Sequence, residues 1–257
     1  MDTAGTLESK STVKGLSFPA STRKQITSRA KGDSMRLIGF LTLAGLFLLA
    51  PPSRGFEAKH DFAKWEKSIA AFEEADKKNP PPKGTILFVG SSTIVRWKSL
   101  AKDFPNHTTL NRGFGGNHIC DSTYYADRMI LPYEPKAIFL RAGGNDINSG
   151  KAPEQVFADF QEFVAKVHAK LPQTKIFYIG LAPSVKRWPN AEKERTLNAL
   201  IAEFTKKDPR LTYIDTYSMT LGADGQPRPE LFVKDQLHFN EEGYKLLAER
   251  VRPFFPE

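Results

Sequence analysis

The sequence contains very little cysteine and, beyond its N-terminal region, little excess charge. Cys120 is the single cysteine among 257 residues, so an internal disulfide is excluded. Of the 37 Lys and Arg residues, eight lie in residues 1–56, against three of the 29 acidic residues, which leaves residues 57–257 with 29 basic and 26 acidic side chains. No basic stripe is interleaved with aromatic residues. Neither a disulfide scaffold nor a nucleic-acid partner is therefore expected.

Metal-ligand spacing and a phosphate-binding loop are also missing. His60, His107, His118 and His168 are scattered along the chain instead of being grouped at the spacing of metal ligands. His118 is close to Gly116 and could line a site, but we interpret it more simply as a loop residue. No glycine-rich phosphate loop follows the first expected strand, which disfavours a nucleotide binder. We expect neither a metal nor an organic cofactor.

Hydrophobic runs longer than 14 residues are absent, and the one run of that length is near the N-terminus. Residues 1–34 are rich in Ser, Thr, Lys and Arg without apolar periodicity, so we expect them to be disordered or not translated. Met35 and Arg36 then precede the apolar residues 37–50, which end at Pro51. This length is typical of a signal peptide and short for a membrane span. We expect synthesis to begin at Met35 and residues 35–56 to form a signal peptide.

A signal peptide implies export to the periplasm or the extracellular space. Cleavage is expected within residues 50–58, which leaves residues 57–257 as one domain with no stable membrane insertion. The alternative is that residues 37–50 remain as an uncleaved membrane anchor. No cysteine directly follows the apolar run, so lipid attachment at that point is not expected.

From residue 57 onward, short apolar segments alternate with longer amphipathic ones. The apolar segments predict five strands, at residues 85–89, 108–111, 137–140, 175–179 and 211–214. The amphipathic segments predict an opening helix around residues 62–72, a closing helix that starts near Asn240, and helices at residues 94–100, 121–129, 153–170 and 190–207. This alternation predicts a three-layer α/β/α sandwich around a five-stranded parallel sheet of the flavodoxin-like type.

Four short polar segments interrupt this pattern, at residues 90–92, 115–117, 143–146 and 235–238. The first three follow the first three expected strands. Ligands of open parallel sheets bind beyond the carboxyl ends of the strands, so these three segments should meet at one edge. The fourth segment precedes the closing helix and can return to the same edge.

The four segments supply the groups that acyl transfer through a serine requires. Ser92 is the candidate nucleophile, His238 the general base, and Asp235 the carboxylate that orients the imidazole. A separation of three residues lets Asp235 and His238 meet within one turn. The simpler interpretations are that Ser92 caps a helix and that Asp235 and His238 belong to a surface loop or half of a metal site.

An oxyanion hole can be assembled from the same segments. The backbone amides of Ser92 and Gly116 and the side-chain amide of Asn145 are the candidate donors. Glycine at position 116 permits a close backbone approach to substrate. Taken singly, residues 115–116 and 145–146 are equally consistent with ordinary turns.

The combination resembles the SGNH hydrolase superfamily of GDSL-type esterases and lipases over residues 85–257. The blocks that carry the resemblance are Phe-Val-Gly-Ser-Ser-Thr-Ile at 88–94, Asn-Arg-Gly-Phe-Gly-Gly at 111–116, Gly-Gly-Asn-Asp at 143–146 and Asp-Gln-Leu-His at 235–238. The resemblance implies that Ser92, Gly116, Asn145 and His238 are the residues for which that superfamily is named.

Two positions depart from the namesake motif, because Ser91 stands in place of Asp and Thr93 in place of Leu. These changes are similar to the branch that contains platelet-activating-factor acetylhydrolase subunits and lysophospholipase-like esterases. The nucleophile motif of α/β-hydrolases, Gly-x-Ser-x-Gly, does not fit, because Ile94 occupies its last position.

The expected function is hydrolysis of a carboxylic ester through an acyl-serine. A mature chain of about 200 residues leaves little room for a lid, so a short acyl group such as acetyl on a carbohydrate or a lipid is expected. Residues 183–188, after the fourth strand, could border the leaving-group side of the site. The alternative is a non-catalytic carbohydrate-binding module on an esterase scaffold.

Overall fold

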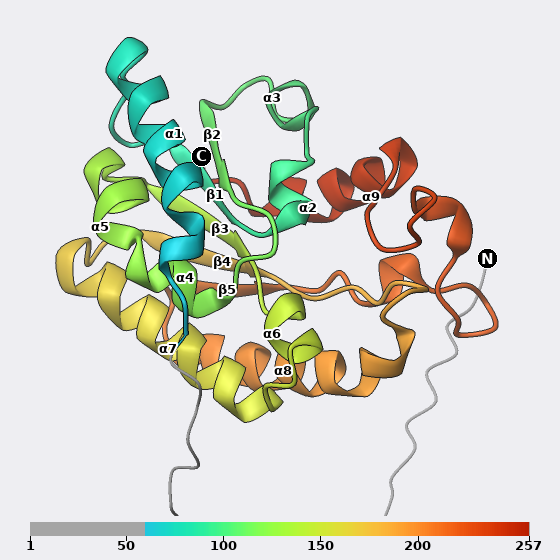
Figure 1. The fold of residues 1–257 in the computed structure, drawn as a ribbon. Coiled ribbons are helices and arrows are strands. Elements are labelled where there is room, and N and C mark those ends of the chain that lie inside the picture. The colour runs from blue at the N-terminus through green and yellow to red at the C-terminus, as the bar shows by residue number, and fades with distance from the viewer. Residues whose placement is uncertain (1–59, 257) are drawn as a thin grey trace, which may run out of the picture. The chain divides into compact units, whose positions relative to one another are not determined.

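Five parallel strands form the centre of the computed structural model, which describes residues 60–256 (Figure 1). The strands are β1 (Ile86–Gly90), β2 (Thr109–Gly113), β3 (Ala137–Arg141), β4 (Lys175–Ile179) and β5 (Leu211–Ile214). Their spatial order is β2-β1-β3-β4-β5, and every neighbouring pair is parallel. β2 lies on one side of β1, and β3 lies on the other side. The direction in which strands are added to the sheet therefore reverses beside β1.

The strands have two buried faces, as their continuous apolar sequences predict. In β1, Leu87 and Val89 face one hydrophobic cluster while Ile86 and Phe88 face a second. All residues of β1 and of β3 are buried. Because successive side chains of a strand point to opposite faces, this pattern requires a helical layer on each side. The predicted three-layer α/β/α architecture is therefore confirmed.

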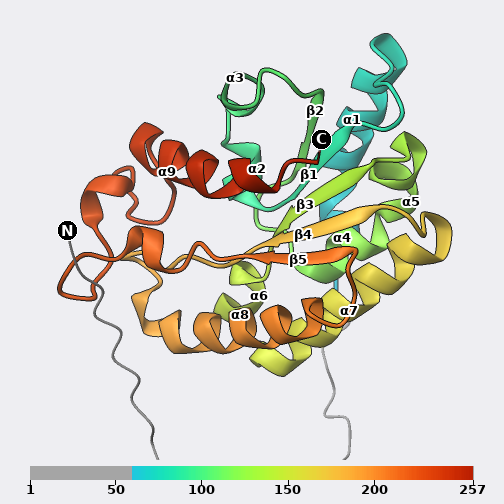
Figure 2. The ribbon, with the colours of Figure 1, turned by 180° about the vertical axis from the view of Figure 1, so that it is seen from behind.

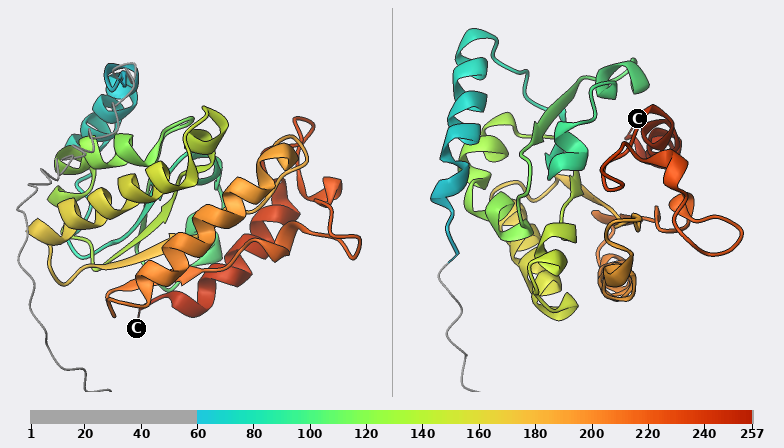
Figure 3. Two further views of the ribbon diagram at one scale, coloured as in Figure 1. Left: turned by 90° about the horizontal axis from the view of Figure 1, so that it is seen from below. Right: turned by 45° about the vertical axis from the view of Figure 1, so that its right-hand side comes forward.

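Two sets of helices supply these layers (Figures 1 and 2). The first set packs on the face of Leu87 and comprises α1 (Glu66–Lys78), α4 (Ile119–Tyr124), α5 (Ala126–Met129), α7 (Pro153–Lys170) and α8 (Ala191–Thr205). The second set packs on the face of Phe88 and comprises α2 (Ser92–Val95), α3 (Leu100–Asp103) and α9 (Glu241–Val251). Figure 3 shows α7 and α8 side by side below the sheet.

Several predicted element bounds agree closely with the structure and others do not. The helix at residues 153–170 and the strands at 175–179 and 211–214 are observed with the predicted limits. The side chain of Asn240 caps α9 by accepting a hydrogen bond from the Gly243 amide at 3.1 Å. The short helix α6 (Gly144–Asn148), which follows β3 directly, was not predicted.

The predicted helix at residues 94–100 is wrong, because the structure has two short helices there. The amide of Trp97 bonds to the Ile94 carbonyl, three residues back, so the last turn of α2 tightens and ends. Trp97 is buried and donates from Nε1 to Asp103 at 2.6 Å, and Ser99 donates to the same carboxylate at 2.7 Å. These contacts fold residues 96–99 into a turn. The predicted helix at 121–129 is likewise divided, at Tyr125, into α4 and α5.

The predictions for residues 1–34 and 35–56 lie outside the described residues. Within residues 60–256, no helix is both long and apolar enough to cross a membrane.

Candidate active site

Ser92 is positioned by a sharp turn at the carboxyl end of β1. Gly90 has a φ of +148°, and a Cβ at this position would lie 2.1 Å from the carbonyl oxygen of Arg141 in β3. The next amide, of Ser91, donates to that same carbonyl at 3.1 Å. Only glycine fits so close an approach, and the turn makes Ser92 the first residue of α2. Its hydroxyl therefore stands at the switch point of the sheet.

His238 and Asp235 reach Ser92 from the loop before α9. His238 Nε2 lies 2.9 Å from Ser92 Oγ, and His238 Nδ1 lies 2.7 Å from Asp235 Oδ2. This geometry fits a tautomer in which Nδ1 donates to the carboxylate and Nε2 accepts from the serine hydroxyl. The structure thus brings together the three side chains that the sequence suggested for a nucleophile, a base and an orienting acid.

The loop around Asp235 holds the carboxylate in place and in its charged form. Asp235 Oδ1 accepts hydrogen bonds from the amides of Leu237 and His238, both at 2.9 Å. Partial burial alone would raise the pKa of Asp235, but the bonds from the His238 side chain and from these two amides outweigh it and hold that pKa well below its ordinary value. Gln236 adopts a left-handed φ of +56°, which turns the chain between the two functional residues.

Asn145 and Gly116 lie on the same edge of the sheet. Asn145 belongs to α6, and its Nδ2 donates to the Asn117 carbonyl at 3.0 Å. Gly116 follows β2, which pairs with β1 so that Gly113 lies beside Gly90. It has a φ of +80°, and a Cβ there would come 3.1 Å from the Trp65 ring. Ser92 and these two residues therefore follow three strands of one edge, as the sequence predicted.

Arg187 is a site residue whose role the sequence did not reveal. Its Nη2 donates to Asn145 Oδ1 at 2.8 Å, which fixes which side of the amide carries the N–H groups. The sequence identified residues 183–188 only as a border of the site. Arg187 and Asn145 are 42 positions apart, and no local pattern links them.

A small polar cavity adjoins Ser92 and His238. Its volume is about 50 Å³, and its walls include Arg141, Arg187 and Glu194. Glu194 is only 4% exposed, its Oε2 has no hydrogen-bond partner among the described residues, and burial raises its pKa to about 7. Arg141 is buried as well and donates to the carbonyl of Gly180. The cavity is thus small, polar and partly open to solvent.

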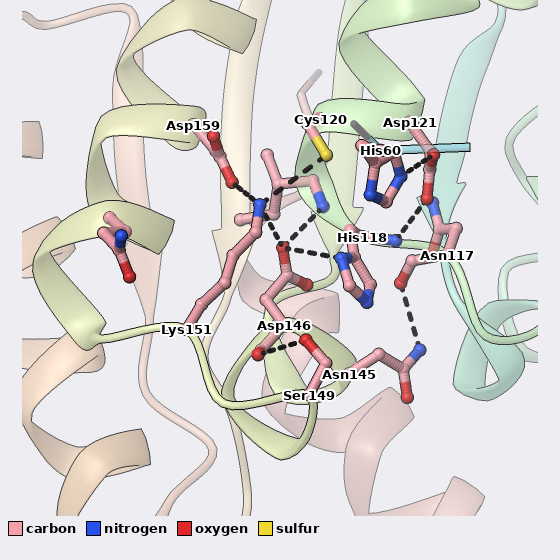
Figure 4. Close-up of polar contacts among 12 residues, drawn as sticks. His60, Asn117, His118, Cys120, Asp121, Asn145, Asp146, Ser149, Lys151 and Asp159 are labelled. Atoms are coloured by element: carbon pink, nitrogen blue, oxygen red, sulfur yellow. Dashed lines mark hydrogen bonds and ion pairs between the residues drawn. The ribbon is translucent and has the colours of Figure 1, made fainter. Parts of the chain in front are cut away.

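A second polar cluster lies near Asn145, around His118 and Asp146 (Figure 4). His118 lies here, in the loop that directly precedes α4 as expected, and its Nδ1 is 3.9 Å from the carboxylate of Asp146. Burial lowers the pKa of His118 to about 4 and raises that of the fully buried Asp146 to about 7. Cys120 and His60 lie beside it, and no local sequence pattern links His60 to the other two residues.

A family model and a related protein both match most of the described residues. Residues 89–246 match the model of the GDSL-like Lipase/Acylhydrolase family. The chain is 27% identical over 177 residues to the platelet-activating factor acetylhydrolase IB subunit alpha2 of Homo sapiens, a match that covers 64% of this chain and 72% of that protein.

Solved structures share the fold. A putative platelet activating factor protein from Streptococcus pneumonia superposes with a TM-score of 0.67 at 19% identity, over 75% of this chain and 92% of the other. A catalytic mutant of an acetylxylan esterase from Geobacillus stearothermophilus superposes with a TM-score of 0.55 at 14% identity, over 68% and 96% of the two chains. The family match over residues 89–246 covers more than half of the chain, so the chain belongs to the GDSL-like lipase/acylhydrolase family and is an ester-hydrolysing enzyme.

Proposed function

We propose that this enzyme cleaves its ester through an acyl-serine intermediate, with Ser92, His238 and Asp235 as the catalytic residues. The observation that carries the proposal is the continuous chain of contacts from Ser92 Oγ to His238 Nε2 at 2.9 Å and from His238 Nδ1 to Asp235 at 2.7 Å. A serine hydroxyl becomes a competent nucleophile when an adjacent base accepts its proton.

In the first half of the reaction, Ser92 Oγ attacks the ester carbonyl while its proton passes to His238 Nε2. The Asp235 carboxylate stabilises the imidazolium that forms. The imidazolium then gives the proton to the leaving alkoxide, so the alcohol departs and the acyl group remains on Ser92. In the second half, His238 takes a proton from water, the hydroxide attacks the acyl-serine, and the proton returns to Ser92 as the acid leaves.

The tetrahedral intermediates carry a negative oxygen that needs donors. We assign this role to the amides of Ser92 and Gly116 and to Nδ2 of Asn145. Asn145 Nδ2 carries two hydrogens, one of which is used by the Asn117 carbonyl, so the other remains for the oxyanion. Loss of one such donor typically lowers turnover by about 100- to 1000-fold.

The acyl group that suits this site is short. The cavity beside Ser92 has a volume of about 50 Å³, which favours an acetyl-sized group over a long chain. An acetylhydrolase and an acetylxylan esterase are among the related proteins, and each name describes that protein alone. We propose an acetyl ester of a carbohydrate or a lipid as the substrate.

Hydrolysis of a generic acetyl ester by the wild type and by Ser92→Ala tests the mechanism. The wild type should turn over the ester, show a burst of released alcohol and accumulate an acylated Ser92 visible by mass spectrometry, and Ser92→Ala should lose nearly all activity. Ser91→Ala is the matched control and should retain activity. Equal rates for wild type and Ser92→Ala would refute the mechanism, and inactivity of both would favour the carbohydrate-binding module. Butyryl and octanoyl esters should react progressively more slowly.

We further propose that the enzyme is exported by a signal peptide at residues 35–56. The 14-residue apolar run at 37–50 supports this proposal. N-terminal sequencing of protein recovered from the medium or periplasm should give a first residue within 50–58. Retention of residues 37–50 in the mature chain would instead identify a membrane anchor.

A further inference from the structure

A histidine-rich cluster lies outside the catalytic residues, where the start of α4 meets the segment before α1. His60, His118 and Cys120 each offer one ligand atom there, and these three atoms all lie within 4.8 Å of one another. Figure 4 shows the sulfur of Cys120 and the rings of both histidines facing a common space. Two imidazoles and one thiol are the ligand types that Zn²⁺ and similar borderline-soft ions prefer.

The orientation of His60 is fixed by a buried carboxylate. Asp121 is fully buried, and its Oδ1 lies 2.7 Å from His60 Nε2. Histidine ligands of metals commonly bond through their other ring nitrogen to a carboxylate, which sets the tautomer and the direction of the ring. With Nε2 held by Asp121, the Nδ1 atom of His60 is the one available for an ion.

The same carboxylate positions the second histidine. Asp121 Oδ2 accepts a hydrogen bond from the backbone amide of His118 at 2.7 Å. The His118 side chain is 13% exposed, and its Nδ1 is buried without a hydrogen-bond partner among residues 60–256. A buried ring nitrogen without a partner is costly, and an ion or water that binds it removes that cost.

From this arrangement we propose that His60, His118 and Cys120 bind a Zn²⁺-type divalent ion, with water as the fourth ligand. In a tetrahedral site, metal–ligand distances near 2.0–2.3 Å imply ligand–ligand separations of about 3.3–3.6 Å, so the side chains need to move inward by about 1 Å. The thiol of Cys120 releases its proton to solvent when the sulfur binds the ion.

The site would brace the loop that carries the oxyanion donors. His118 follows Asn117, whose carbonyl accepts from Asn145, and Gly116 is two positions before His118. Lys151 Nζ stands 3.7 Å from Cys120 Sγ and forms an ion pair with Asp159 at 2.7 Å. The positive charge of Lys151 repels the divalent cation, so we expect the Lys151→Met variant to bind the metal more tightly than the wild type.

Co²⁺ and Zn²⁺ titrations of the chelator-treated protein test the site. The wild type should bind one equivalent of Co²⁺ with a near-ultraviolet thiolate-to-cobalt absorption band, which Zn²⁺ displaces. Cys120→Ser should lose the band, and Asp121→Asn should weaken binding by about 10- to 100-fold. The matched control is His107→Gln, which alters a histidine outside the cluster and should titrate like the wild type. Zn²⁺ should raise the melting temperature of the wild type and of His107→Gln and leave that of Cys120→Ser unchanged.

Three outcomes would overturn the proposal. They are no binding by the wild type, a cobalt spectrum without a thiolate band, and equal affinity in Cys120→Ser. Folding of each variant is checked by circular dichroism, and if Cys120→Ser does not fold, His60→Gln replaces it with the same expectation of lost affinity. None of these measurements depends on esterase activity, so the metal site and the proposed function succeed or fail separately.

Discussion

Arg187 Nη2 donates a hydrogen bond to Oδ1 of Asn145 at 2.8 Å, and this contact orients the amide of the proposed oxyanion donor. With Oδ1 held by a cation, Nδ2 points away from Arg187 and toward the Asn117 carbonyl. We predict that Arg187→Met lowers kcat by roughly 10- to 100-fold with a smaller change in KM. A misoriented Asn145 amide stabilises the oxyanion of the transition state less well and affects substrate binding little. Steady-state kinetics on an acetyl ester measures this split.

A double-mutant cycle separates this effect from a general loss of structure. Once Asn145 is replaced by Ala, the further change Arg187→Met should cost little, because Arg187 acts by orienting the Asn145 amide. Arg195→Met, at an exposed arginine of α8, is the control and should leave kcat unchanged. Additive losses in the double mutant would show that Arg187 does not act through Asn145.

Replacement of Asp235 should impair catalysis more than stability. Asp235→Asn removes the charge that stabilises the imidazolium and allows the other tautomer of His238, so kcat should fall by about 10³- to 10⁴-fold. The matched control is Asp224→Asn, because Asp224 is also a turn aspartate that accepts a backbone amide, from Gln226 at 3.0 Å. A loss of less than tenfold in Asp235→Asn would argue against its assigned role.

The pKa of Asp235 also gives a direction for the dependence of stability on pH. A carboxylate whose pKa is lowered in the folded state stabilises the protein above its unfolded-state pKa, and this contribution disappears as the pH falls through the folded-state value. Asp235→Asn should therefore show a smaller loss of stability than the wild type below about pH 4. Urea titrations at pH 3 and pH 6 measure this difference.

The sequence predicted the sheet and the catalytic edge because both depend on local patterns. Buried parallel strands are continuous in apolar residues, and polar residues such as Ser92 and Asn145 follow them directly, so topology places them together. Contacts between distant segments had no such pattern. Arg187 meets Asn145, and His60 meets His118, only because separate elements dock on each other.

Helix bounds failed where tertiary contacts override the local period. Trp97 is spaced to continue the apolar face of a helix, yet its indole turns inward to Phe88 and Phe104, and its Nε1 bonds to Asp103. Burial of the large indole and its hydrogen bond to Asp103 stabilise the turn at residues 96–99 in place of a further turn of helix. The periodic pattern therefore predicted correctly which residues are buried, but its prediction of one continuous helix was wrong.

Glu194 should make the protein less stable as the pH rises. Burial raises its pKa in the folded state from 4.5 to about 7, whereas the unfolded chain ionises near the ordinary value. Between these values the folded state binds more protons than the unfolded state, so the free energy of unfolding falls, by on the order of 3 kcal/mol for this group. Glu194→Gln should remove much of that fall.

This prediction is checked by measuring the free energy of unfolding in urea at pH 5 and at pH 8 for the wild type and for Glu194→Gln. Glu194→Gln should gain stability relative to the wild type at pH 8, and the gain should vanish at pH 5. Glu192→Gln, at an exposed position of the same helix, should follow the wild type at both pH values. An equal pH dependence in the wild type and Glu194→Gln would show that Glu194 ionises normally in the folded protein.

Gly90 should tolerate no side chain, because the turn that presents Ser92 brings its backbone against β3. A Cβ at Gly90 would lie 2.1 Å from the Arg141 carbonyl, a distance that forces the two strands apart. We predict that Gly90→Ala costs more than about 3 kcal/mol of stability and abolishes activity. Gly150→Ala separates this clash from backbone strain, since Gly150 also has a positive φ, +101°, with open space around its Cβ position. It should cost only about 1 kcal/mol, and equal urea midpoints for the two variants would show that strain, not the contact with β3, requires glycine at position 90.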